Sequence, residues 1–87
     1  MSAAAVVQVG DRLAGAGREL ALVADFATAA RLGFERQAAR GSPVAGVAAG
    51  RFARIEDAAR ELREEIEGLV RAVGRDVAAA YEELAGG

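Results

Sequence analysis

The chain has 87 residues, room for one small domain over residues 1–87, and it contains no cysteine, histidine or tryptophan. Disulfide, thiol and thiolate-metal chemistry are therefore excluded, and the usual general bases and metal ligands are reduced to carboxylates and a few hydroxyls. The net charge of −2 argues against a nucleic acid partner, because phosphate neutralisation requires a basic surface. We expect no enzymatic activity, no metal site and no cofactor.

An apolar residue recurs at alternating steps of three and four along the first half of the chain, which predicts a helix over about 3–39. Gly15 and Gly17 flank Ala16 in this series, a pattern that either lets another helix approach closely or reflects a composition rich in glycine and alanine. That composition, with arginine as the only basic residue, hints at a bacterial source. The series is Val6, Val9, Leu13, Ala16, Leu20, Val23, Ala27, Ala30 and Phe34.

Residues 40–43 carry the signals that end one helix and start the next. Gly41 can adopt the left-handed conformation that closes a helix. Ser42 is a favourable N-cap, and Pro43 suits the first helical position, where its missing N–H costs nothing. A connection this short places the two helices antiparallel.

The second half of the chain predicts another helix over about 44–84, with apolar residues again three and four apart. Charged residues fill the remaining positions, and Glu56–Arg60 and Glu67–Arg71 are expected ion pairs at a separation of four. The apolar series is Phe52, Ile55, Ala59, Leu62, Ile66, Leu69, Val73, Val77, Ala80 and Leu84.

Two helices alone cannot surround this much apolar surface. We therefore expect an all-α fold, an antiparallel helical hairpin that associates as a four-helix bundle with a second hairpin, in a homodimer or a heterodimer. The apolar edge left uncovered within the hairpin would face the partner. The predicted packing and partner residues are Val6, Val9, Leu13, Leu20, Val23 and Phe34, against Phe52, Ile55, Leu62, Ile66, Leu69 and Val73.

The segment after the turn resembles the WXG family of small type VII (ESX) secretion substrates, in which a Trp-x-Gly turn precedes a pair of small residues and a phenylalanine. Gly46, Ala48, Ala49 and Phe52 stand at the matching offsets, and Val44 stands in place of the tryptophan. The resemblance covers about nine residues in motif and the whole chain in architecture. It implies a non-enzymatic helical hairpin that is secreted without a signal peptide and works through a helical partner.

The family's export signal is a tyrosine followed four residues later by an acid. Tyr81 is suitably placed, but Ala85 occupies the fourth position, and Glu82 and Glu83 come earlier. The chain thus resembles the partner that lacks a complete signal, or a diverged secretion-associated protein. The alternative is a cytoplasmic structural or adaptor coiled coil, or a targeting partner of a toxin that is not itself exported.

A membrane role is disfavoured by the pattern of charge. The least charged stretch, residues 20–30, contains Asp25, so we expect no stable membrane insertion. A surface-bound amphipathic helix is also disfavoured, because the polar positions mix both signs of charge.

Overall fold

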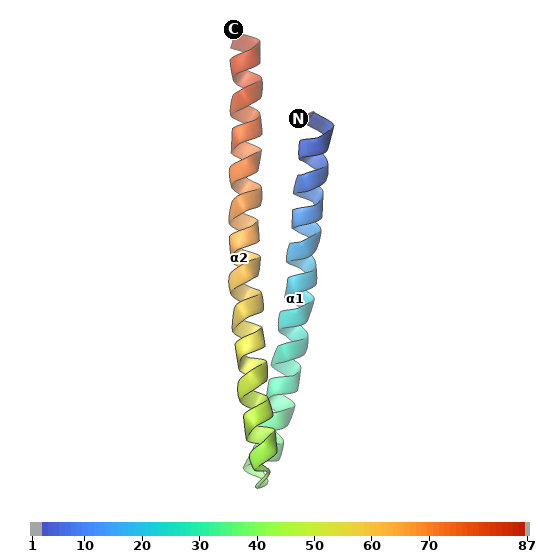
Figure 1. Ribbon diagram of the computed structural model, residues 1–87, viewed down its shortest axis with the longest axis vertical. Coiled ribbons are helices and arrows are strands. Elements are labelled where there is room, and N and C mark those ends of the chain that lie inside the picture. The colour runs from blue at the N-terminus through green and yellow to red at the C-terminus, as the bar shows by residue number, and fades with distance from the viewer. Residues whose placement is uncertain (1–2, 87) are drawn as a thin grey trace.

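Two long helices make up the described part of the chain. The computed structural model describes residues 3–86 except the side chains of Ala3 and Val6, so the packing predicted for Val6 lies outside the described residues. Helix α1 spans Ala3–Ala39 and helix α2 spans Pro43–Gly86. The helices run antiparallel, and the C-terminal end of α2 projects beyond the N-terminal end of α1 (Figure 1). The predicted all-α hairpin is confirmed.

The turn between the helices has the geometry that its residues favour. Gly41 has a φ of 102°, in the left-handed region, and its N–H donates to the Ala38 carbonyl at 2.9 Å. The Ser42 N–H donates to the Gln37 carbonyl at 3.3 Å, which completes a glycine-closed helix end. The Ser42 hydroxyl then accepts from the Ala45 N–H at 3.2 Å and caps α2, which begins at Pro43.

Small side chains fill the contact between α1 and α2. The buried apolar residues are all alanines, and they come from both helices: Ala24, Ala27, Ala45, Ala49 and Ala59. Because alanine projects little beyond the backbone, the two helices pack closely where these residues meet. We call this row the alanine line.

Three phenylalanines lie at the edge of the alanine line. The rings of Phe34 and Phe52 stack with their centroids 5.7 Å apart, and Phe26 meets Phe52 edge to face at 6.5 Å. Such ring pairs contribute about 0.5–1.5 kcal/mol each beyond the area that they bury. They join the two helices on one side of the hairpin only.

The predicted packing set divides into two groups. The half-buried group lies beside the alanine line and consists of Leu13, Leu20, Phe34, Phe52, Ile66 and Val73. The other group is Val9, Val23, Ile55, Leu62 and Leu69, whose exposed fractions are 44–51 %. The prediction that this second group packs between the two helices is wrong, because alanines occupy the positions that face the opposite helix.

One expected ion pair needs correction, because Arg63 Nε pairs with Glu67 at 3.1 Å, so Glu67 is held by the preceding arginine rather than by Arg71. A Cβ added at Gly17 would lie 4.0 Å from Ile66, so the packing of α1 on α2 does not require glycine there. The expected Glu56–Arg60 pair is present.

The hairpin alone leaves an unusually large surface. It forms a rod of 70 × 15 × 14 Å with 6382 Å² of accessible area. A compact chain of this size exposes about 4,800 Å². No large side chain in the described part of the chain is fully buried. The excess of about 1,600 Å² is total surface, polar and apolar, that the elongated shape of a two-helix rod leaves exposed.

We expect Ser42→Ala to lower the free energy of unfolding by about 1 kcal/mol, because the first turn of α2 loses the hydroxyl that accepts the Ala45 N–H. Ser42→Asp, which retains an oxygen acceptor, should stay close to the parent chain. Chemical denaturation followed by circular dichroism at one protein concentration measures both. Equal loss in the two variants would contradict the capping role.

Candidate interaction surface

Six of the exposed large apolar residues lie on one side of the hairpin, a side that also carries the charged residues Arg12 and Glu19 at steps of seven before Phe26. Val23 directly precedes Ala24 of the alanine line, and Ile55 directly precedes Glu56, which is also buried there. When two helices run antiparallel, the residue that directly precedes a contact residue points to the same side of the hairpin in both helices. Steps of seven residues continue each stripe along its helix. This side, called here the apolar face, consists of Val9, Val23, Phe26, Ile55, Leu62 and Leu69, which are 44–70 % exposed.

The opposite side of the hairpin is mainly charged. Asp25 and Asp57 directly follow the contact residues Ala24 and Glu56, so they point away from the apolar face. Val7 and Leu32 are exposed apolar residues on this side, and Leu22 and Val47 are also exposed outside the apolar face. The other charged residues on this side are Arg18, Glu64, Arg71 and Arg75. The hairpin as a whole is therefore amphipathic.

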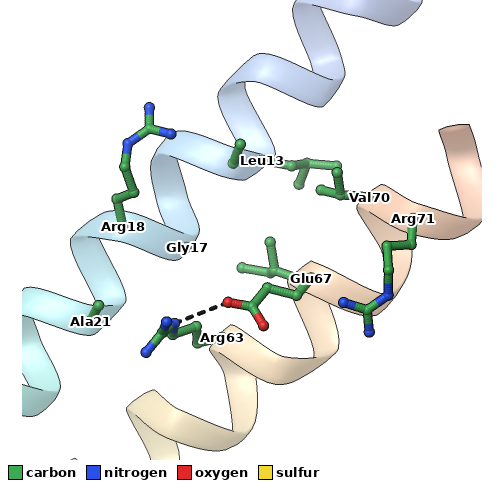
Figure 2. A pocket seen from close by; sticks show the side chains of 10 residues that line it. Leu13, Gly17, Arg18, Ala21, Arg63, Glu67, Val70 and Arg71 are labelled. Atoms are coloured by element: carbon green, nitrogen blue, oxygen red, sulfur yellow. Dashed lines mark hydrogen bonds and ion pairs between the residues drawn. The ribbon is translucent and has the colours of Figure 1, made fainter.

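A groove of about 330 Å³ lies between the helices toward their open end (Figure 2). Ala14, Gly17 and Ala21 leave room on the α1 side, and Ile66 and Val70 contribute from α2. Arginines and one glutamate complete the lining: Arg18, Arg63, Arg71 and Glu67. The single carboxylate of the lining, Glu67, is paired with Arg63 at 3.1 Å.

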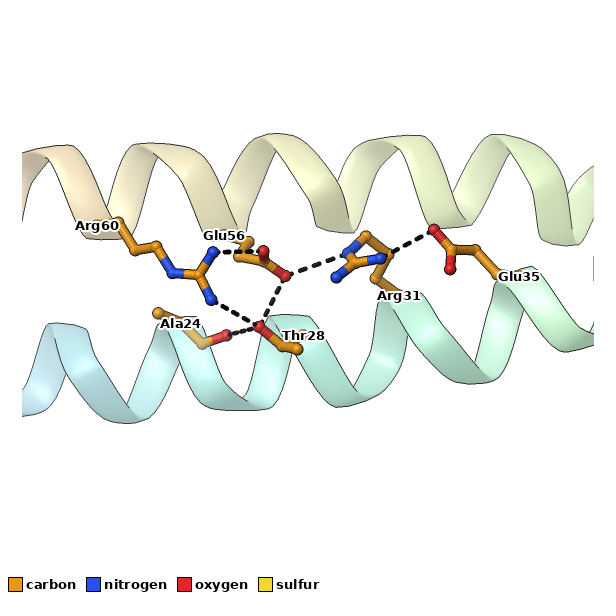
Figure 3. Close-up of polar contacts among 6 residues, drawn as sticks. All are labelled: Ala24, Thr28, Arg31, Glu35, Glu56 and Arg60. Atoms are coloured by element: carbon orange, nitrogen blue, oxygen red, sulfur yellow. Dashed lines mark hydrogen bonds and ion pairs between the residues drawn. The ribbon is translucent and has the colours of Figure 1, made fainter.

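A polar cluster interrupts the alanine line at its centre (Figure 3). Glu56 is only 6 % exposed, and its carboxylate accepts from Thr28 Oγ1 at 2.7 Å and from Arg31 Nε at 3.2 Å, both on α1. Arg60 donates to the same carboxylate from α2 at 2.6 Å. Thr28 Oγ1 also lies 2.9 Å from the Ala24 carbonyl, and its single proton serves one of these acceptors at a time.

The surroundings of Glu56 favour its ionised form. The hydrogen bond from Thr28 is the largest cause that lowers the pKa of this carboxyl, and Arg31 adds to it, whereas burial acts in the opposite direction. Arg31 is held in turn by Glu35, whose Oε1 lies 3.0 Å from Nη1. A buried carboxylate with these partners fixes which residues of α1 and α2 stand opposite each other, since sliding one helix would leave the charge without its hydrogen bonds.

Sequence reasoning paired Glu56 with Arg60 but did not detect the contacts to α1. Thr28 and Arg31 are ordinary surface residue types in a helix, and no local pattern indicates that they meet a residue on the other helix. The one sequence feature that pointed to these contacts was the position of Glu56, which directly follows Ile55 of the apolar series and so lies near the contact between the helices.

The segment that resembles the WXG turn is distributed over both sides of α2. Ala49 is buried, Ala48 and Phe52 are half-buried, and Val44 is 78 % exposed. Adding a Cβ at Gly46 would bring it to an ordinary 3.8 Å from Ala38. The predicted export region, Tyr81, Glu82 and Glu83, is exposed on the part of α2 that projects beyond α1 (Figure 1).

Within residues 3–86, no group of three or more acidic, histidine or cysteine side chains is placed to hold a metal ion. Neither α1 nor α2, over the residues described, contains a window long and apolar enough to span a membrane. No protein-family model matches the chain, and comparisons with curated proteins and with solved structures find no match.

We expect Glu56→Gln to lower stability at pH 7 and to reduce the pH dependence of unfolding. Because the pKa of Glu56 is lowered by folding, its contribution is complete above the ordinary glutamate value of 4.5 and is lost as the pH falls through the folded value. The stability difference between parent and variant should therefore shrink between pH 7 and pH 3.

Thermal unfolding at several pH values and one protein concentration measures this difference. Glu64→Gln is the matched control, since Glu64 is exposed and has no ion pair in the described part of the chain. A Glu56→Gln deficit that is equally large at pH 3 would show that the charge of Glu56 is not what stabilises the hairpin.

Proposed function

We propose that this protein is a non-enzymatic association module, a helical hairpin that completes its core by docking the apolar face on another helical hairpin to form a four-helix bundle. The observation that carries the proposal is the lack of a large, fully buried side chain in the described chain, together with an apolar face that spans both helices. Burial of one large apolar side chain stabilises a protein by about 1.5–3 kcal/mol. Covering the apolar face would therefore supply the stabilisation from large buried side chains that the alanine line lacks.

The shape of the hairpin supports a helical partner. The apolar face is long, narrow and formed by two antiparallel helices, so another pair of helices can cover it along its full length. A standard protein interface removes about 800 Å² from each partner, and the hairpin exceeds a compact chain by more than that. A lone small ligand would cover only a fraction of such a rod.

We further propose that the bundle serves type VII secretion, as a substrate or as the partner of one. Support comes from the sequence resemblance after the turn and from the exposure of Tyr81, Glu82 and Glu83, which leaves them accessible to a secretion component. Because Ala85 replaces the acid of the export signal, the role of a partner that relies on a second protein's signal fits this chain best.

Association is tested by multi-angle light scattering of the purified chain across a concentration series, alone and coexpressed with small helical proteins encoded nearby. A complex of defined stoichiometry supports the module. A stably folded single copy that binds none of these proteins contradicts it.

Export is tested separately, by measuring the protein in culture medium with and without an active type VII secretion ATPase. ATPase-dependent release, alone or with a coexpressed partner, supports the secretion role. Retention of a well-formed complex under both conditions favours the adaptor alternative.

We expect Leu62→Asp to weaken association by at least about tenfold, because the partner would then have to bury a charge where it buried leucine. Helix content stays the same or falls with the loss of the partner. Arg75→Asp, on the charged side, is the control and should leave association nearly unchanged. Full helicity and an unchanged oligomer in Leu62→Asp would refute the interface.

A further inference from the structure

Part of the apolar stripe of α2 is symmetric about position 64. Leu62 and Ile66 are equidistant from this position, whereas Phe52 and Val77 have Asp76 and Arg51 at their equidistant positions. The symmetric part matches its own reverse, which is what an antiparallel contact between two copies of one helix requires. The further equidistant apolar pairs are Ile55 and Val73, Ala48 and Ala80, and Val44 and Leu84.

We infer that the partner is a second copy of this chain, with the two α2 helices antiparallel and a two-fold axis beside position 64. The inference rests on the proposed association and adds the identity and direction of the partner. In this arrangement Ile55 of one copy lies against Val73 of the other, and Leu62 lies against Ile66. Each pair occurs twice because the contact is symmetric.

Charge complementarity supports the antiparallel direction. Arg51 and Asp76 border the stripe near its two ends, both are exposed, and neither has an ion-pair partner within the described part of the chain. In the antiparallel dimer, Arg51 of one copy comes next to Asp76 of the other. A parallel dimer would instead place Arg51 against Arg51 and Asp76 against Asp76, which repel.

The end of α2 that projects beyond α1 also has a packing partner in this dimer. Leu84 is 79 % exposed beyond the end of α1, and Val44 is similarly exposed at the turn. The antiparallel arrangement brings Leu84 of one copy over Val44 of the other at both ends of the bundle. The projection of α2 then covers apolar surface that the hairpin cannot reach by itself.

The stripe of α1 is centred at the same level. Gly17 lies opposite Ile66, and Thr28 lies opposite Glu56, so position 64 is level with the region around Leu20. Ala16 and Val23 stand at about equal distances on either side of this region, as do Val9 and Ala30. One two-fold axis therefore suits both helices.

The chain has no cysteine, so introduced thiols report contacts without background. An equimolar mixture of Ile55→Cys and Val73→Cys chains, refolded together, should give a cross-linked heterodimer with a short bismaleimide. Such a reagent is preferred over oxidation because a disulfide forms only within a narrow range of Cα–Cα distances and Cβ directions, whereas the cross-linker accepts a wider range. Ile55→Cys alone should not cross-link, since its two copies would lie far apart.

Light scattering on the same samples gives the mass. A dimer that cross-links only in the mixture confirms the inference. A dimer in which Ile55→Cys alone cross-links efficiently has the parallel direction and overturns it. A single copy that forms a stable complex only with a different hairpin overturns the inference and leaves the proposed function standing, whereas a folded single copy without any partner overturns both.

Charge reversal provides an independent test that does not depend on packing. Arg51→Glu should raise the dimer Kd by about 2- to 30-fold, because two symmetric pairs are lost. The double variant Arg51→Glu with Asp76→Arg should return toward the parent value. Arg54→Glu, a neighbouring exposed arginine, is the matched control, and an equal effect there or no rescue would contradict the antiparallel pairing.

Discussion

The contact between α1 and α2 is made by alanines, and the rest of the molecule depends on this. Alanine at the contact positions allows two long helices to pack closely over many turns, but each alanine buries little apolar area. The larger side chains are displaced to the borders of the contact. The hairpin is thus held by close packing of small residues and has its principal apolar surface on the outside.

The polar cluster around Glu56 gives the alanine line a defined register. A row of similar small side chains fits almost equally well when one helix slides along the other, because no large side chain locks into a matching space. Thr28 and Arg31 of α1 remove that freedom, since only one alignment brings both donors to the buried carboxylate of Glu56 on α2. Stability and specificity therefore come from different residues in this hairpin.

This register has a consequence for association. A symmetric interface requires that the stripes of α1 and α2 present matching positions at the same level, and their relative level is set by the Thr28–Glu56 contact. The apolar face is consequently a property of the hairpin rather than of either helix. The charged opposite side keeps the other surface of the rod solvated, so the association that we propose would use one face only.

Periodicity, caps and turn residues were sufficient to predict two helices, their direction and the turn, because these features depend on interactions between residues close in the sequence. The position of Gly41, Ser42 and Pro43 alone located the break in the helix. The sequence also indicated more apolar surface than one hairpin can bury. It did not show which apolar residues face the other helix, because the series contains alanines and large residues at adjoining positions around the helix.

Only the tertiary structure decided that Ala24 and Ala59 form the contact while Val23 and Leu62 stay exposed. The physical reason is rotation about the helix axis, a choice that depends on how the two surfaces fit together and not on either sequence segment. The same rotation brought Glu56 to Thr28 and Arg31 across the contact.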